Sequence, residues 1–269
     1  MLAIIIPFYK LTFFEATLQS LAHQSDKRFK VYIGDDASPE DCTALLQKFE
    51  GQFDFIYHRF ETNLGGTSLA QQWERCIALS GNEDWLMILG DDDVLGHNVV
   101  EEFYRNLPEI EEIGCNVVRF ATQKLNEFGE CISEIYLHPK VEKASDFFLR
   151  KTRSSLSEYV FRKVNVVKIG FRDFALGWYS DVMAVLEFSD FDTVFTMNES
   201  LVFIRISNYS ISGKQDNFKL KSSATFDFYY YLLKNKKQIF DKLQTKELKK
   251  CICKAYLNDK KQVLNFFKI

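Results

Sequence analysis

Long apolar runs, a leader sequence and metal-binding cysteine patterns are all missing from this 269-residue chain. No apolar stretch approaches the roughly 20 residues that a helix needs to span a bilayer. The amino terminus, MLAIIIPFYK, lacks the basic segment of a signal peptide, and Pro7 interrupts its apolar run. The six cysteines contain no C-x-x-C pair, and four histidines do not complete a zinc pattern. These absences predict an intracellular, cytoplasmic protein whose cysteines are reduced thiols.

Arginine is missing from the carboxyl-terminal part of the chain, where the charge differs sharply from the rest. Residues 214–269 contain 14 Lys, no Arg and 5 acidic residues, although the whole chain has a formal net charge of −3. Residues 1–213 are therefore strongly acidic. The lack of Arg and of any recognition motif argues against nucleic acid as a partner. Two alternatives remain for the basic segment: a helical cap docked on the acidic part, or peripheral contact with the inner face of a membrane.

Strand-like and helix-like segments alternate along the first hundred residues. Apolar runs predict strands over 2–8, 29–35, 53–59 and 84–90, and periodic apolar positions predict helices over 11–24, 38–49 and 67–79. Ser38 is expected to cap the second of these helices, with Pro39 at its first position. This order predicts an α/β fold, a mostly parallel sheet flanked by helices. In such sheets ligands bind beyond the carboxyl ends of the strands.

The pattern changes after residue 110, but no low-complexity linker interrupts it. The sequence predicts strands over 115–122 and 158–162, paired strands within 193–207, and helices over 144–151, 164–169 and 177–188. Residues 216–269 predict two or three lysine-rich helices. The expected boundary near Ser212-Gly213 divides a main domain, 1–213, from a basic helical extension, 214–269.

Three consecutive aspartates, Asp91, Asp92 and Asp93, follow the apolar run WLMIL at the end of the fourth predicted strand. Carboxylates at the end of a buried strand repel one another and are costly to desolvate unless a cation neutralises them. Hard oxygen ligands of this kind suit Mg²⁺ or Mn²⁺, which would bind a substrate phosphate as well. The alternative is a solvated turn in which one Asp caps the next helix.

Other polar residues follow the second and third predicted strands. Asp35 and Asp36 precede a Ser-Pro turn, and they could accept hydrogen bonds from a base or a ribose or merely shape the turn. Asn63 and Gly65, in the sequence NLGG, supply a flexible turn and a helix start that could approach a phosphate or a sugar.

Four segments, IIIPFY, GDDAS, NLGG and WLMILGDDDVL, occur in an order and at spacings that resemble the family 2 glycosyltransferases of GT-A fold. The resemblance covers residues 1–100 well and is looser beyond them. It implies an inverting enzyme that transfers a sugar from a nucleotide-diphosphate sugar, usually a UDP-sugar, with Mn²⁺ or Mg²⁺ as cofactor. It also implies a nucleotide-sugar-binding half, 1–110, and an acceptor half, 111–213.

The resemblance assigns donor-binding residues by position. The residues that would border the base are Pro7, Phe8 and Tyr9. Asp35 or Asp36 would contact the uracil, and the turn with Asn63 and Gly65 belongs to the same half.

The resemblance also assigns the carboxylate motif. The first Asp of the family's motif falls on Gly90 in this chain. Asp93 would be the strongest metal ligand with Asp91 supporting it, and Asp92 would face the ribose or the metal. A histidine that the family often carries is missing here, which leaves Arg205 to face a phosphate.

The family's catalytic base begins a helix, and the segment GWYSDVMAVLEF fits that context. Asp181 is predicted to take the proton of an acceptor hydroxyl, with Asp173 and Glu187 as alternatives, unless Asp181 only stabilises its helix terminus. The predicted reaction is transfer to a hydroxyl of a glycan or lipid-linked acceptor in surface polysaccharide synthesis. Non-catalytic nucleotide-sugar binding and a phosphoacceptor receiver-like module are the alternatives from other classes.

Overall fold

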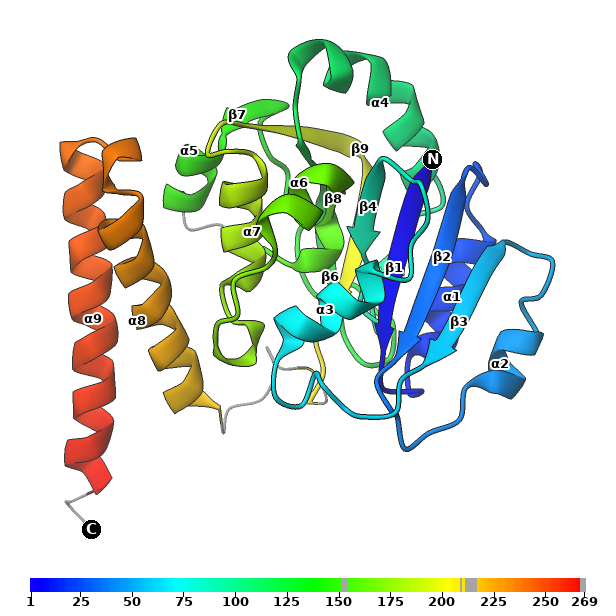
Figure 1. The fold of residues 1–269 in the computed structure, drawn as a ribbon, viewed down its shortest axis with the longest axis horizontal. Coiled ribbons are helices and arrows are strands. Elements are labelled where there is room, and N and C mark those ends of the chain that lie inside the picture. Colours follow the sequence, from blue (N-terminus) through cyan, green and yellow to red (C-terminus); the bar gives the residue numbers. More distant parts are fainter. Residues whose placement is uncertain (151–153, 209, 211–216, 267–269) are drawn as a thin grey trace.

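One mixed sheet runs through the centre of the computed structural model, which describes residues 1–150, 154–208, 210 and 217–266 (Figure 1). The first four strands are parallel: β1 (Leu2–Phe8), β2 (Phe29–Asp35), β3 (Asp54–Arg59) and β4 (Trp85–Ile88). β1 lies between β2 and β4, and β3 is the edge strand on that side. The predicted alternation is confirmed, and the carboxyl ends of these strands meet at one edge of the sheet.

Pro7 occupies the interior strand β1, although proline removes a backbone donor from a strand. The Ile5 carbonyl accepts a hydrogen bond from the Leu89 amide at 2.8 Å, so residues 5 and 7 direct their backbone groups toward β4. Ile5 already pairs with Ile88, the last residue of β4. Pro7 therefore lies where no strand N–H is needed, and β1 can end at the edge beside the aspartates.

Five further strands complete the sheet: β5 (Val94–Leu95), β6 (Val117–Leu125), β7 (Val141–Lys143), β8 (Tyr159–Arg162) and β9 (Thr193–Arg205). Within the described residues the order is β3-β2-β1-β4-β8-β6-β9-β5, and β7 pairs with β9 outside this path. The prediction of paired strands within 193–207 is wrong, because β9 is one continuous strand. Its register against β6 shifts between Met197 and Leu201, so the intervening residues bulge without ending the strand.

Helices cover both faces of the sheet (Figure 1). The core on one face includes side chains of α1 (Phe14–Ala22), α2 (Thr43–Gln47) and α4 (Val99–Ile113). The core on the other face includes side chains of α3 (Leu69–Ile77), α5 (Ala144–Leu149), α6 (Lys163–Ile169) and α7 (Ser180–Phe188). Ile4 of β1 packs in the first core and Ile5 in the second, since successive side chains of a strand point to opposite faces. This explains the continuous apolar run of β1.

The predicted helix over 38–49 is wrong in its start, because α2 begins at Thr43. Ser38 does not cap it. The Ser38 hydroxyl donates to the Tyr9 carbonyl at 2.7 Å, and the Ser38 amide donates to Asp35 Oδ1 at 2.8 Å. Ser38 therefore ties the loop after β2 to the end of β1.

The carboxyl-terminal helices α8 (Phe218–Asn235) and α9 (Lys242–Phe266) lie side by side at one end of the molecule (Figure 1). Phe228, Tyr229 and Leu232 of α8 are buried in the core that α5 and α7 also share. The helical extension is therefore confirmed and docked on the main domain. The predicted boundary near Ser212-Gly213 lies largely outside the described residues. Among the described helices, none has the length and apolar character needed to cross a membrane.

Candidate active site

The carboxylate of Asp91 joins the ends of β1 and β4. Asp91 Oδ2 accepts hydrogen bonds from the backbone amides of Tyr9 and Lys10, each at 2.8 Å. Thr17 of α1 donates to the carbonyl of Asp91 at 3.2 Å and to that of Asp93 at 2.8 Å. Burial is the main cause that raises the pKa of Asp91 above its ordinary value, although the two amides oppose it. Asp91 therefore organises the loop after β1.

Asp93 is almost fully buried, with 5% of its surface exposed. Its Oδ2 accepts a hydrogen bond from Ser157 Oγ at 2.5 Å, and its Oδ1 accepts one from the Arg205 amide at 2.9 Å. Ser157 Oγ also accepts from the Gly90 amide at 3.0 Å. Ser157 lies in a short helical turn, η1 (Leu156–Glu158), so Asp93 ties the aspartate turn to η1 and to β9. No sequence pattern pointed to Ser157.

Asp92 differs from its two neighbours. It is partly exposed, and among the described residues its carboxylate has no hydrogen-bond partner on another residue. Burial and the Asp93 and Asp91 carboxylates raise the pKa of Asp92 well above its ordinary value, while Lys10 opposes this. A divalent cation would offset that repulsion, so the donor set fits Mg²⁺ or Mn²⁺. In the part of the chain that is described, no group of three or more Asp, Glu, His or Cys side chains could hold a metal alone.

Asp35 and Asp36 both form internal contacts. Asp35 is fully buried, and its Oδ2 accepts hydrogen bonds from Tyr57 at 2.6 Å and from Arg59 at 2.7 Å. Asp36 is 4% exposed and forms an ion pair with Arg75 of α3. In this conformation Asp35 has no surface to offer a uracil, and Asp36 has little.

Asp36 also shapes the turn that contains Asn63 and Gly65. Its Oδ1 accepts from the Leu64 amide at 2.7 Å, and its Oδ2 accepts from the Gly65 amide at 2.9 Å. A Cβ at Gly65 would lie 2.6 Å from Asp36 Oδ2, so glycine is required by close approach there. Asn63 Oδ1 accepts from the Gly66 amide at 2.6 Å, and Ser68 caps α3 by accepting from the Gln71 amide.

Two residues assigned to ligands prove to be buried. Phe8 is fully buried and packs against Phe14, with ring centroids 4.6 Å apart, so its side chain belongs to the core and has no exposed surface. Pro7 and Tyr9 remain partly exposed beside it. Arg205 is 5% exposed, and its guanidinium donates to the carbonyls of Asp92 and Asn126. Through these hydrogen bonds Arg205 stabilises the aspartate turn, and it has almost no exposed surface that could contact a phosphate.

Asp181 lies in the first turn of α7, where it is partly exposed. Ser180 anchors the start of this helix by donating to the Arg172 carbonyl at 2.6 Å. The preceding turn, η2 (Ala175–Gly177), contacts α3, and Figure 1 shows it on the side of the sheet where β1 to β4 end. Burial above all raises the pKa of Tyr159, and Asp181 contributes to the shift. Asp181 therefore interacts electrostatically with Tyr159, the first residue of β8, which follows the turn that holds Asp93.

The two alternative base candidates occupy different surroundings. Glu187, at the far end of α7, is 6% exposed and accepts hydrogen bonds from Arg172 at 3.0 Å and from Tyr231 at 2.7 Å. It is therefore structural. Asp173 is exposed on the loop before η2.

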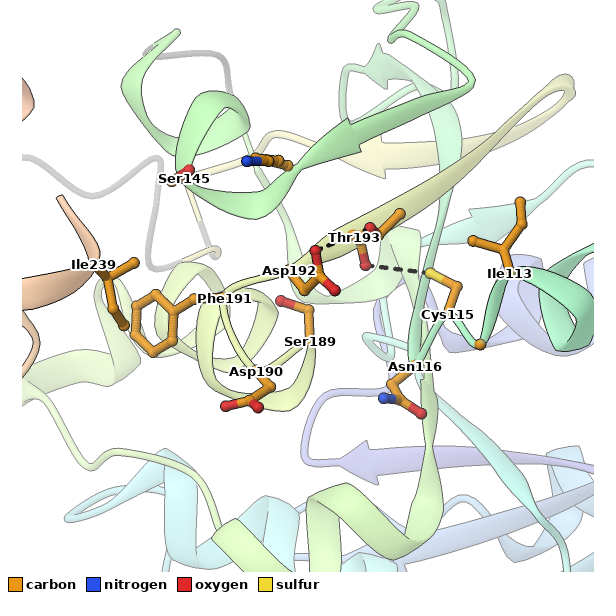
Figure 2. Close-up of a pocket in the computed structure, with 12 residues that line it drawn as sticks. Ile113, Cys115, Asn116, Ser145, Ser189, Asp190, Phe191, Asp192, Thr193 and Ile239 are labelled. Carbon is orange, nitrogen blue, oxygen red and sulfur yellow. Dashed lines mark hydrogen bonds between the residues drawn. The ribbon is translucent and has the colours of Figure 1, made fainter. Parts of the chain in front are cut away.

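Two pockets of the described residues are not lined by any of these carboxylates. A pocket of about 520 Å³ is drawn in Figure 2, where Cys115, Asn116, Asp192 and Thr193 line it. It lies where β6 and β9 begin, at the edge of the sheet opposite the aspartates. A second pocket, of about 590 Å³, lies between α1 and β5.

Comparison with known proteins identifies the fold and the family. Residues 3–163 match the family model described as Glycosyl transferase family 2. TarS 1–349 of S. aureus in complex with UDP-GlcNAc is 14% identical, with a TM-score of 0.69 over 95% of this chain and 71% of that chain. GalNAc-T7 with UDP, GalNAc and Mn²⁺ is 13% identical, with a TM-score of 0.60 over 95% and 54%.

A third solved structure, the mannosyltransferase PcManGT of Pyrobaculum calidifontis with GDP-Man and Mn²⁺, is 10% identical, with a TM-score of 0.61 over 87% of this chain and 64% of that chain. Among curated protein sequences, no match to this chain was found. Because the family match covers more than half of the chain, and the sheet and helices have the matching arrangement, this protein belongs to glycosyl transferase family 2 and has the GT-A fold.

Proposed function

We propose that this protein is an inverting, metal-dependent glycosyltransferase that uses a nucleotide-diphosphate sugar, with a UDP-sugar as the first candidate. The observation that carries the proposal is the partly exposed Asp92 carboxylate, which lies between two neighbours that internal hydrogen bonds hold in place. Family membership and the nucleotide sugars named for TarS and PcManGT support it. The family match leaves the receiver-like module without support, and a non-catalytic binder remains the alternative.

We infer that Asp92 is the principal metal ligand, in place of the Asp93 expected from the sequence. Asp93 and Asp91 already accept two hydrogen bonds each, and they would act by fixing the turn and by adding negative charge. One or two carboxylates together with a substrate diphosphate are a typical set for Mg²⁺ or Mn²⁺. A cation bound here would stabilise the charge that develops on the leaving diphosphate.

Asp181 is the proposed general base. Its carboxylate would take the proton of an acceptor hydroxyl while that oxygen forms a bond to the anomeric carbon of the donor. The bond from the anomeric carbon to the diphosphate oxygen breaks, and the nucleoside diphosphate leaves from the opposite face. The configuration at the anomeric carbon is therefore inverted. The acceptor would be a hydroxyl of a glycan or of a lipid-linked saccharide, as in surface polysaccharide synthesis.

A panel of UDP- and GDP-sugars with Mn²⁺ or Mg²⁺ tests this function. We expect metal-dependent binding and turnover of at least one donor by the wild type. Asp181→Asn should retain donor binding and lose transfer by about 100-fold or more, since base catalysis contributes 10²–10⁴-fold. Asp173→Asn is the matched control and should keep transfer. Absence of donor binding with metal present would refute the proposal, whereas full transfer by Asp181→Asn would refute only the base.

The outer face of α9 supports a second proposal, peripheral contact with the inner, cytoplasmic face of a membrane. The lysines that lie exposed on α9 and form no ion pair among the described residues include Lys242, Lys246, Lys249 and Lys254. Leu243 and Leu257 are exposed beside them, by 79% and 54%. These four lysines are therefore not paired with acidic residues of the main domain, whereas Lys236 at the end of α8 contacts Glu187. A lysine surface with exposed apolar side chains suits an anionic lipid surface near a lipid-linked acceptor.

Vesicle flotation tests this contact. We expect binding to vesicles with phosphatidylglycerol and none to pure phosphatidylcholine. Each lysine near an anionic surface contributes about 1 kcal/mol, so Lys246→Gln with Lys249→Gln should weaken binding roughly 30-fold. Lys48→Gln with Lys140→Gln, two exposed lysines of the main domain, is the matched control. Equal flotation of both double variants would refute the proposal.

A further inference from the structure

The loop that leads into α7 has an unusual backbone. Tyr179, the residue before Ser180, has φ 70° and ψ 0°, which is the left-handed conformation. Leu176 has φ 62° in the same loop. Bulky residues rarely adopt this conformation, and it persists only where the surroundings impose it. Asp181, the proposed base, follows Tyr179 by two residues.

Aromatic side chains of α8 hold the Tyr179 ring. Phe228 is fully buried and stacks on Tyr179, with ring centroids 4.5 Å apart and planes inclined by 14°. Tyr229 meets the same ring at an angle, with centroids 5.8 Å apart. Burial, and then contacts with Tyr179 and with Cys251 of α9, raise the pKa of Tyr229. α8 therefore packs directly on Tyr179, and α9 contacts Tyr229 through Cys251.

The other side of the loop rests on α3. A Cβ added to Gly177, which has φ 63°, would lie 3.0 Å from Trp73 and 3.1 Å from Leu69. The loop is therefore enclosed between a helix of the donor half and a helix of the carboxyl-terminal extension. A side chain at position 177 would crowd Trp73 and Leu69 and would be strained by the positive φ.

α8 also holds the far end of α7. The Tyr231 hydroxyl donates to Glu187 Oε1 at 2.7 Å, and Glu187 is nearly fully buried. Arg172, which lies over the Tyr231 ring at 4.6 Å, donates to Glu187 Oε2 at 3.0 Å. α7 is thus fixed by α8 at its first turn and at its last.

We propose that Tyr179 and Phe228 are positioning residues, through which α8 holds the first turn of α7 and so directs Asp181 at the acceptor hydroxyl. The role rests on the proposed function, because it assumes that Asp181 is the base. A reacting group misplaced by 1 Å can cost about 100-fold in rate. The carboxyl-terminal extension is therefore needed for the chemical step, while the donor half binds the nucleotide sugar without it.

Kinetics and hydrogen exchange together test this role. Phe228→Leu removes the stacked ring but stays apolar, and Tyr179→Gly removes the other ring but accepts the positive φ. We expect kcat to fall about 10- to 100-fold in both, with the donor KM changed by less than about 2-fold. Exchange of the backbone amides of residues 180–184 should become faster. Tyr179→Phe keeps the stacked ring and should retain much more of the kcat than Tyr179→Gly does.

A destabilised control separates positioning from loss of stability. Leu46 lies in the core on the face of the sheet opposite to α7 and α8. Leu46→Ala should therefore lower Tm without changing kcat or the exchange of residues 180–184. The proposal is refuted if Phe228→Leu keeps the wild-type kcat, if donor KM rises along with the fall in kcat, or if exchange is unchanged. If the wild type transfers no sugar, the proposed function fails and the catalytic role fails with it. Exchange alone then shows whether α8 orders α7.

Discussion

At the scale of single residues, the three consecutive aspartates differ in the hydrogen bonds that their carboxylates accept. All three are the same residue type and follow the same strand, yet two of them accept hydrogen bonds from distant parts of the chain. A carboxylate that already accepts two such bonds is held in place, so it suits a structural role better than the role of a metal ligand. Only Asp92 combines partial exposure with a carboxylate that no other described residue binds.

Asp92→Asn should therefore affect metal-dependent donor binding, and Asp93→Asn should affect stability. Asp92→Asn is expected to abolish Mn²⁺-dependent donor binding and to lower transfer by about 100-fold or more, because the metal supplies several kcal/mol to the transition state. Its Tm without metal should not fall, since repulsion between carboxylates is removed.

Asp93→Asn should destabilise the fold by about 2 kcal/mol, because it disturbs the buried hydrogen bonds of Asp93. Calorimetric titration and thermal melts measure both. Metal binding lost in Asp93→Asn alone, with unchanged Tm, would make Asp93 the ligand.

Among the elements, the turn between β3 and α3 shows how a strand end and a helix start are fitted together. Asp36 binds two amides of this turn and Arg75 of α3, and Ser68 caps the helix. The fit leaves no room for a side chain at Gly65. The turn lies beside the proposed donor site, so its shape should matter for binding.

Gly65→Ala tests the fit of this turn. The added Cβ would lie 2.6 Å from Asp36 Oδ2, so the turn or the carboxylate must move. We expect the donor KM to rise about 10-fold, which corresponds to about 1.4 kcal/mol of lost binding, with kcat changed less. Gly81→Ala is the control, because an added Cβ there lies no closer than 3.4 Å to another side chain. Equal donor KM values for the two variants would contradict the expectation.

At the scale of the whole molecule, a buried ion pair connects strands β6 and β7 across β9. Arg119 of β6 is fully buried and donates to Glu142 of β7 at 2.6 Å and to Thr196 of β9 at 2.8 Å. Arg150 also forms an ion pair with Glu142. Burial would raise the pKa of Glu142, but the hydrogen bonds from Arg150 and Arg119 outweigh it, and the pKa is lowered.

This pair predicts a pH dependence of stability. A carboxyl with a lowered pKa in the folded state stabilises the fold above its unfolded pKa, and this contribution is lost as pH falls through the folded pKa. Glu142→Gln should cost about 3 kcal/mol at pH 7, because it leaves Arg119 buried without its full counter-charge. The difference in unfolding free energy between Glu142→Gln and the wild type should become smaller below pH ~4.5, as measured by thermal melts. Glu109→Gln, in the exposed pair with Lys140, should cost less than about 1 kcal/mol. A gap that stays constant with pH would contradict this explanation.

The sequence by itself determined the order of strands and helices in the first hundred residues, because apolar period and strand length are local properties. It also determined that Asp91, Asp92 and Asp93 lie at a strand end, and the family motifs followed from the same segments. It misjudged the start of α2 and the continuity of β9, where Ser38 and the bulge after Met197 respond to distant partners.

Only the tertiary structure decided which of these polar residues support the site and which face it. Asp35, Phe8 and Arg205 were all assigned to ligands from the sequence, but each is buried by contacts within the fold. The same holds for the basic carboxyl-terminal segment. Apolar residues of α8 pack on Tyr179 and against α7, while lysines of α9 are exposed, and no local pattern contains both facts. The physical reason is that burial depends on packing between segments distant in sequence, which local periodicity does not specify.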